Sequence, residues 1–337
     1  MRNPHVQSLL VSLPFRRRKV EQFAAPLLAA SKEQLLDCGD GIRLQAFFSR
    51  PATSLGKTAV LLHGWEGNSN TLYILSLAQK LFAGGFDVVR LNLRDHGATH
   101  HLNSELFHSC LLPEVVGAFR RIQSMLPGQL LHLAGFSLGG NFALRVAAQA
   151  DAAGLKIAKV VAISPELDPA ETLRAVERGF SFYHRYFMRK WGLSLLRKQA
   201  AWPSVYDFAG MLRLPDLRQM TQEMVRRFTP FGSLDEYLRG YSITGDKLAS
   251  LTVPARVITA CDDPIVPVSG LQRLPRLPGL SVTVTRHGGH CGFFDQLAGP
   301  SWLENHLVAE LADDSEATCH NKRSCPLTDC ASPGTPV

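Results

Sequence analysis

The stretch LLHLAGFSLGGNFALRVAAQA, residues 130–150, joins a short apolar run to a longer helix-like run through a small polar residue. At the joint, Ser137 stands two positions from Gly135 and two from Gly139, which is a G-x-S-x-G pattern. A tight turn from strand to helix strains its central residue, and glycine at the flanking positions avoids a steric clash. The stretch therefore predicts a strand, a sharp turn that exposes the Ser137 hydroxyl, and a helix whose first amides favour negative charge.

Similar apolar runs alternate with helix-length segments on both sides of this joint. The expected strands are KTAVLL (57–62), FDVVRLN (86–92), LLHLAGF (130–136) and IAKVVAIS (157–164). The expected helices between them are NTLYILSLAQKLFAGG (70–85), PEVVGAFRRIQSML (113–126) and LGGNFALRVAAQA (138–150). Because neighbouring parallel strands need a crossover helix to return the chain, the alternation predicts a doubly wound α/β fold with a mostly parallel sheet.

Further stretches complete the expected sheet. An antiparallel hairpin is predicted for residues 33–38 and 42–48, which flank the turn sequence GDG. The last strands are expected within 254–264 and at 280–287, and a closing helix is expected at 301–312.

The alternation is interrupted between residues 165 and 252. This segment has a helical pattern, contains many aromatic and cationic residues and is broken by prolines, so we interpret it as a helical insertion over the carboxyl ends of the strands. Residues 1–312 are expected to form one domain that includes the insertion. Residues 313–337 have the composition of an unstructured tail.

The insertion contains a dense patch of cations and aromatics at residues 178–198. Its cations are Arg185, Arg189, Lys190, Arg197 and Lys198. We interpret the patch as a helix whose cationic side chains snorkel over an apolar cleft. Peripheral contact with an anionic membrane surface is the alternative.

A serine hydroxyl is a poor nucleophile at neutral pH, so it needs a base, and the base needs an acid that fixes its tautomer. The stretch RHGGHCGFF, residues 286–294, follows the last expected strand. Within it, His290 has a flexible glycine setting from which its imidazole can reach back over the sheet, and it is the expected base. His287 is the rival, but an end of the strand or a loop contact explains it.

The acid is expected after the preceding strand, in ACDDPIVP, residues 260–267. Asp262 and Asp263 are neighbours, so only one of them can face the imidazole well. Asp263 is favoured because a proline fixes the turn after it, and Asp262 is expected to cap the turn. Glu166 and Asp168, one strand earlier, are the alternatives, although helix capping explains Asp168.

Two backbone amides are expected to stabilise an oxyanion. One is the amide of Leu138, directly after the candidate nucleophile, and the other is the amide of Trp65 in the loop LLHGWEGNSN, residues 61–70. The Trp65 side chain is expected to form a wall of the substrate pocket. His63 is interpreted as a residue that braces this loop.

Composition argues against several other classes of protein. The net charge is +7 and the isoelectric point is near 9.1, but the basic residues are dispersed and no nucleic-acid-binding motif accompanies them. No apolar run reaches the roughly 18 residues that a membrane span requires. The first 20 residues have their cations after the apolar patch, the reverse of a secretory signal, so we expect a cytoplasmic protein.

Two groups of possible metal ligands have simpler explanations. The first group is Asp95, His96, His100 and His101. It lies at a turn after a strand and lacks a second carboxylate. The second group is Cys319, His320, Cys325 and Cys330. It contains no Cys-x-x-Cys pair, so we expect neither a metal nor another cofactor.

These motifs resemble the α/β-hydrolase superfamily, and within it the YheT-like esterases, which include eukaryotic membrane-anchored phospholipase and monoacylglycerol-lipase relatives. The matching stretches are NPHVQSLL (3–10), LLHGWEG (61–67), GFSLGGN (135–141), ACDDPIVP (260–267) and GGHCGFF (288–294). The resemblance implies an α/β-hydrolase fold and a charge relay on Ser137, Asp263 and His290. The loop at 92–110 differs from the glycine- and cysteine-rich version of many members, so lipid preference is not carried over.

The sequence thus predicts a serine esterase. Ser137 would attack the acyl carbon of a carboxylic ester, His290 would transfer the proton, Asp263 would orient the imidazole, and water would resolve the acyl-enzyme. A lipid-like ester with a medium-length acyl chain is expected from the aromatic residues of the insertion, which are Phe180, Phe182, Tyr183, Phe187 and Trp191. An acyltransferase with the same triad, and a non-catalytic binding protein on the same fold, are the alternatives.

Overall fold

The computed structural model describes residues 2–11, 13–295 and 301–313. From residue 314 onward, the predicted tail and its cysteine and histidine residues lie outside the described residues. An eight-stranded sheet has the strand order β1-β2-β4-β3-β5-β6-β7-β8. The strands are β1 (Ser31–Asp37), β2 (Arg43–Ser49), β3 (Lys57–Leu62), β4 (Asp87–Leu91), β5 (Leu130–Phe136), β6 (Ile157–Ile163), β7 (Ala255–Ala260) and β8 (Leu280–Thr285).

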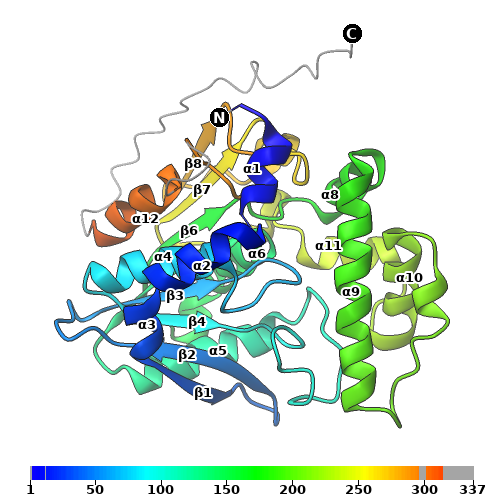
Figure 1. Ribbon diagram of the computed structural model, residues 1–337, viewed down its shortest axis with the longest axis horizontal. Coiled ribbons are helices and arrows are strands. Elements are labelled where there is room, and N and C mark those ends of the chain that lie inside the picture. Colours follow the sequence, from blue (N-terminus) through cyan, green and yellow to red (C-terminus); the bar gives the residue numbers. More distant parts are fainter. Residues whose placement is uncertain (1, 12, 296–300, 314–337) are drawn as a thin grey trace.

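The predicted fold class is confirmed. Strand β2 pairs antiparallel with both β1 and β4, and all other neighbouring strands pair parallel (Figure 1). The sheet is therefore mostly parallel with an antiparallel amino-terminal hairpin, as the sequence predicted.

Helices cover both faces of this sheet. They are α1 (Pro4–Leu10), α2 (Pro14–Phe23), α3 (Ala25–Ala29), α4 (Leu72–Ala83), α5 (Leu112–Met125), α6 (Leu138–Ala148), α7 (Ala150–Ala153), α8 (Pro169–Arg178), α9 (Ser181–Ala201), α10 (Leu217–Phe228), α11 (Leu234–Tyr241) and α12 (Trp302–Ala312). Short 3-10 turns are η1 (Met211–Arg213), η2 (Gly245–Leu248) and η3 (Val268–Arg273). None of the helices that the described residues form has the length and apolar character needed to cross a membrane.

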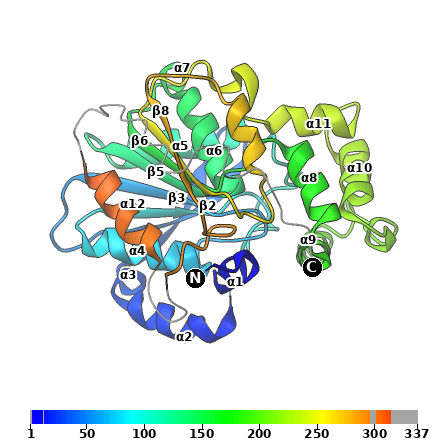
Figure 2. The ribbon, with the colours of Figure 1, turned by 90° about the horizontal axis from the view of Figure 1, so that it is seen from above.

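The central strands of the sheet are rich in apolar residues because both of their faces are buried. In β3, Ala59 and Leu61 pack into a core with α4 and α12, while Val60 and Leu62 pack into a second core with α5 and α6. Figure 2 shows these two pairs of helices on opposite sides of the strands. A strand buried on both faces has no polar alternation, which is typical of parallel sheets in α/β proteins.

The amino-terminal arm, for which the sequence analysis predicted no element, forms α1, α2 and α3. Pro4, Pro14 and Pro26 each lie at the first or second position of one of these helices. Proline is favourable there because its missing N–H would have no helical acceptor and its fixed φ already suits a helix. The spacing of prolines in the arm was therefore a helix-start signal.

Residues 164–254 connect β6 to β7 and contain α8, α9, α10 and α11. These helices gather at one end of the sheet, and α9 runs across that end (Figure 1). Since parallel strands β3, β5, β6 and β7 all end there, the segment lies above the loops that follow them.

One cation of α9 does not snorkel, contrary to the prediction from the sequence. The Lys198 side chain is fully buried, and its Nζ donates to Asp95 Oδ1 at 2.8 Å and to the carbonyls of Asn103 and Glu105 at 2.7 and 2.8 Å. A buried ammonium needs such partners because desolvation of a charge costs several kcal/mol. Lys198 thus fastens α9 to the loop after β4.

We expect Lys198→Met to lower the free energy of unfolding by about 3–5 kcal/mol, because it leaves the buried Asp95 carboxylate without its cation. Equilibrium unfolding in urea measures this loss. The control is Arg197→Met at the neighbouring exposed position, which should change stability by less than about 0.5 kcal/mol. Equal losses in the two variants would contradict the assigned role, whereas partial recovery in Lys198→Met with Asp95→Asn would support it.

Candidate active site

Ser137 occupies the sharp turn that the sequence predicted between β5 and α6. Its φ of 53° and ψ of −120° lie in a region that L-residues rarely adopt. The turn is held by two backbone hydrogen bonds, from Ser137 N to Ile163 O at 2.8 Å and from Asn141 N to Ser137 O at 3.0 Å. Strain of this kind persists only where the surroundings enforce it, and it places the serine side chain at the start of a helix.

The two glycines of the motif are required by close backbone approach. A Cβ at Gly135 would lie 2.2 Å from Gly139 O, and a Cβ at Gly139 would lie 2.4 Å from Leu62 O. Both contacts are with main-chain atoms, which cannot swing aside as a flexible side chain could.

Gly135→Ala and Gly139→Ala are therefore each expected to lower the free energy of unfolding by about 3 kcal/mol, through overpacking against the backbone. Urea denaturation provides the measurement. Gly210→Ala is a matched control, because nothing lies within 4 Å of the added Cβ and its φ is −66°. If all three variants were equally stable, close packing would not be the reason for the glycines.

His290 and Asp263 form the pair that the sequence favoured. The distance between His290 Nδ1 and Asp263 Oδ2 is 2.9 Å, and the Asp263 side chain is completely buried. The other oxygen, Asp263 Oδ1, accepts from the amides of Ile265 and Val266 at 2.9 and 3.0 Å. These bonds fix the carboxylate, which in turn fixes the imidazole with Nε2 available on its far side.

The rival residues form a separate pair. Asp262 Oδ2 lies 3.2 Å from His287 Nδ1, and Asp262 Oδ1 accepts from the amides of Gly288 and Gly289, both at 2.9 Å. Asp262 therefore holds the loop that carries His290 and does not contact that imidazole. Asp168, the other alternative, caps α8 by accepting from Ala170 N at 2.9 Å.

The charge of Asp263 governs the protonation of His290. Burial disfavours the imidazolium, but the neighbouring carboxylate outweighs it and holds the pKa of His290 well above its ordinary value. The pair can thus accept a proton and stabilise the cation that results.

Helix α1 holds the loop of His290 from outside. The amide of His290 donates to Ser8 Oγ at 2.8 Å. The Gln7 side chain donates to Phe294 O at 2.8 Å and accepts from Phe294 N at 2.7 Å. Nearer the start of α1, His5 Nδ1 lies 3.0 Å from the hydroxyl of Tyr183 on α9. One short helix therefore supports both the histidine loop and the insertion.

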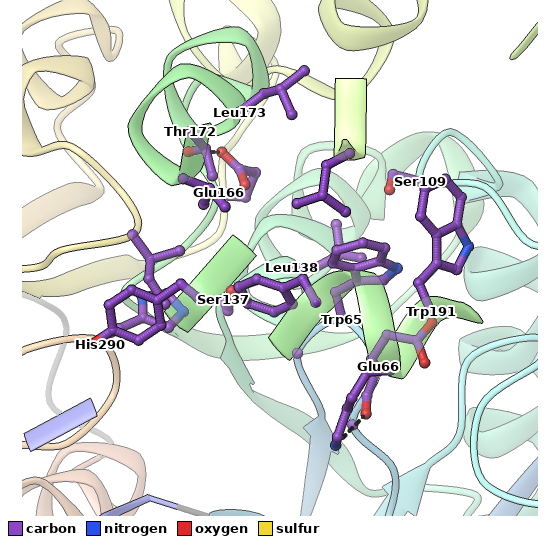
Figure 3. Close-up of a pocket in the computed structure, with 18 of the residues that line it drawn as sticks. Trp65, Glu66, Ser109, Ser137, Leu138, Glu166, Thr172, Leu173, Trp191 and His290 are labelled. Carbon is purple, nitrogen blue, oxygen red and sulfur yellow. Dashed lines mark hydrogen bonds between the residues drawn. The ribbon is translucent and has the colours of Figure 1, made fainter. Parts of the chain in front are cut away.

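Ser137 and His290 open into the same cavity, whose volume is about 250 Å³ (Figure 3). Trp65 and Leu138, the expected oxyanion residues, line it as well. The loop of Trp65 is adjacent to the serine, because a Cβ on Gly64 would lie 3.2 Å from Ser137 Cβ. The amides of Trp65 and Leu138 donate to no acceptor within the described chain, so both can serve a ligand.

Aromatic side chains make the cavity wall mostly apolar. The ring of Trp65 stacks on Phe187 at 5.4 Å and meets Trp191 edge-on at 5.5 Å. Phe182 and Tyr183 also line the cavity. Of the five aromatics that the sequence analysis proposed for the pocket, Phe180 is the exception: it lies outside the lining and is 55% exposed.

Polar groups that the sequence analysis did not place in the cavity also line it. Burial raises the pKa of Glu66 to about 8, although Lys190 opposes this shift. Lys190 Nζ donates to the carbonyl of Glu66 at 3.1 Å. Burial raises the pKa of Glu166 to about 7. The sequence analysis named Glu166 only as an alternative acid of the triad. Its position directly after a strand was the one sequence signal that could have placed it in the cavity.

His63 braces the loop of Trp65, in agreement with the sequence analysis. Its Nδ1 lies 2.8 Å from Gly64 O and its Nε2 accepts from Leu93 N at 3.2 Å. Burial lowers the pKa of His63 to about 4, so the ring is neutral at physiological pH.

Three members of the first group of possible metal ligands, Asp95, His96 and His100, have partners within the protein. Asp95 binds Lys198, His96 Nδ1 lies 2.7 Å from Arg94 O, and His100 Nε2 lies 2.9 Å from Ser194 Oγ. The described residues contain no cluster of three or more potential ligands with the geometry of a metal site.

Comparison with known proteins agrees with this architecture. The chain is 26% identical over 322 residues to the Escherichia coli (strain K12) protein named "Putative esterase YheT", a match that covers 94% of this chain and 92% of that protein. It is 27% identical over 232 residues to monoacylglycerol lipase ABHD2 of Mus musculus, and spans about half of that relative, 53% of its length against 62% of this chain. The solved structure of an esterase from Pyrococcus furiosus matches with a TM-score of 0.57 at 15% identity, over 84% of this chain and 90% of that one.

The sequence model of the family described as "alpha/beta hydrolase fold" matches residues 58–297, which include the serine turn, the buried acid and the histidine loop. Since the match extends over more than half of the chain, the protein belongs to the alpha/beta hydrolase family.

Proposed function

We propose that the protein is a serine hydrolase that cleaves carboxylic esters. The observation that carries the proposal is the convergence of a strained serine and a carboxylate-bound histidine on one apolar cavity. The esterase and lipase relatives support the same reaction class.

In the acylation step, Ser137 Oγ attacks the ester carbonyl carbon while His290 Nε2 takes the hydroxyl proton. Asp263 stabilises the imidazolium, and the amides of Trp65 and Leu138 stabilise the oxyanion. The bond from the carbonyl carbon to the alcohol oxygen then breaks, and the proton on His290 passes to that oxygen. The alcohol leaves and the acyl group stays on Ser137.

In the deacylation step, water takes the place of the alcohol. His290 removes a proton from this water, its oxygen attacks the acyl carbon, and Ser137 recovers its proton as the carboxylic acid forms. The aromatic wall around Trp65 and Trp191 is suited to an acyl chain because it offers large apolar surface and few polar partners.

A labelling experiment tests the proposal. A fluorophosphonate probe should react with the wild type and not with Ser137→Ala, since it requires an activated serine. Loss of labelling together with ester hydrolysis in the wild type supports the assignment. An unlabelled wild type that cleaves no ester would point instead to a binding protein, and transfer of the acyl group to added alcohol in preference to water would point to an acyltransferase.

Chain length should affect the rate. We expect kcat/KM to rise at least about tenfold from p-nitrophenyl acetate to p-nitrophenyl octanoate, because each buried methylene contributes up to about 0.8 kcal/mol. Initial rates with the two esters under the same conditions give the comparison. A flat profile, or one that favours acetate, would show that the aromatic wall does not bind the acyl chain.

A further inference from the structure

Glu166 is a cavity residue to which the proposed mechanism assigns no role. It follows β6, and its amide donates to Ser137 O at 3.3 Å. Its own carbonyl accepts from Asn141 Nδ2 at 2.9 Å. These bonds attach the backbone of Glu166 to the turn that carries the nucleophile, so the side chain begins at a fixed position beside the reacting atoms.

Helix α8 of the insertion holds the carboxyl group of Glu166. Thr172 Oγ1, on α8, donates to Glu166 Oε1 at 2.5 Å. No lysine or arginine forms an ion pair with it in the described part of the chain, and Oε2 has no hydrogen-bond partner among those residues. Glu166 lines the cavity, and Oε2 is not among the buried polar atoms that lack a partner, so this oxygen is accessible to a ligand there.

The protonation of this group suits a neutral partner. Burial is the main reason that the pKa of Glu166 rises to about 7, with smaller opposing effects from Thr172 and His290. Near neutral pH the group is therefore often a carboxylic acid, which can both donate and accept a hydrogen bond. A hydroxyl group has the same two capacities and carries no charge that would require a counter-ion.

Position indicates which part of an ester meets Glu166. The oxyanion amides belong to Trp65 and Leu138, whereas the leaving oxygen must lie beside His290 to receive its proton. Figure 3 shows Glu166 and Thr172 above Ser137, with Trp65 and Trp191 on the other side of Leu138. Glu166 therefore faces the alcohol portion of a bound ester and not its acyl chain.

We propose that Glu166, held by Thr172, binds a hydroxyl group on the alcohol portion of the ester, next to the scissile bond. Substrates of the preferred class are then monoesters of diols or polyols, and esters of simple alcohols are cleaved less efficiently. This inference rests on the proposed esterase function and identifies the residue that selects the alcohol.

A pair of esters that differ in one group isolates this contact. The first is 2-hydroxyethyl octanoate and the second is propyl octanoate, in which a methyl group replaces the hydroxyl. The ratio of their kcat/KM values is measured for the wild type, Glu166→Met and Glu166→Gln. Glu171→Met is the matched control, because Glu171 lies five residues further along the chain, on α8, and bonds Ser269 and Arg273 outside the cavity.

We expect Glu166→Met to lower the ratio of hydroxyethyl to propyl ester about tenfold, which is the effect of losing one buried hydrogen bond. Glu166→Gln, which keeps a donor and an acceptor, should stay within about threefold of the wild type, and Glu171→Met should leave the ratio unchanged. A residue that acted only through His290 would change both rates equally. An unchanged ratio in Glu166→Met overturns the proposal.

Fluorophosphonate labelling separates this result from a failure of the esterase proposal. If the wild type is not labelled and cleaves neither ester, the proposed function itself is wrong. If the wild type is active and Glu166→Met does not fold, Thr172→Val is measured instead, since it releases the carboxyl from α8. A ratio that Thr172→Val leaves at the wild-type value would then overturn the proposal.

Discussion

Replacement of His290 by alanine is expected to lower kcat for ester hydrolysis by on the order of 10⁶-fold. Without the imidazole, the Ser137 hydroxyl keeps its proton and attacks poorly, so Ser137→Ala should show a loss of similar size. Because the two groups act as one unit, the double variant should be no slower than either single variant. Single-turnover and steady-state rates with p-nitrophenyl octanoate provide the measurement.

His287→Ala is the control for this experiment. His287 lies three residues before His290, but its ring bonds Asp262 and its side chain is 37% exposed. The variant should retain kcat within about tenfold of the wild type, since it loosens a loop and removes no base. A loss as large as that of His290→Ala would mean that the two histidines have been assigned the wrong roles.

Asp263→Asn is expected to lower kcat about 10⁴-fold, although the change replaces only one oxygen by nitrogen. The amide cannot hold the imidazole in the tautomer that presents a basic Nε2 to Ser137, and it cannot stabilise the imidazolium. Asp262→Asn is the matched control at the adjacent position. Its effect on kcat should be far smaller, because Asp262 bonds the loop amides of Gly288 and Gly289.

The pH dependence gives a second result for the same pair. Only neutral His290 can act as a base, so kcat/KM should rise as pH increases through its pKa. Asp263 holds this pKa well above 6.5, and the acid limb of the wild type should therefore have its midpoint above pH 6.5. In Asp263→Asn, burial remains but the stabilising charge is lost, so the midpoint should shift to lower pH. An unchanged midpoint would contradict the assigned pairing.

Much of the fold could be predicted because the apolar runs in the sequence coincide with the strands that are buried in the core. The run KTAVLL ends in four consecutive apolar residues, and β3 is indeed buried on both faces there. Helices α1 and α3 were missed because they have only seven and five residues, too few to show a helical period, and α2 was missed because basic residues dominate it. A proline nevertheless lies at the first or second position of each helix. The burial of Lys198 could not be predicted, since its partner Asp95 lies 103 residues away in the sequence.

In the candidate site, the sequence predicted those residues whose roles require a short local pattern or a position directly after a strand. The serine turn is a five-residue pattern, and Asp263 and His290 each follow a strand that ends at the same edge of the sheet. Sequence alone could not place Glu166 in the cavity as a group separate from the charge relay. That placement depends on Thr172, which the insertion brings over the end of β6.

The support that α1 gives to the histidine loop has a consequence for biosynthesis. Ser8 precedes His290 by 282 residues and Gln7 precedes Phe294 by 287, so these contacts cannot form until all of the intervening chain has been translated. Until then α1 lacks the partners that hold it in the folded protein, and this segment should be more susceptible to proteases than it is in the finished fold. The candidate site would be complete only after the segment that carries His290 and Phe294 has been translated and has packed against α1.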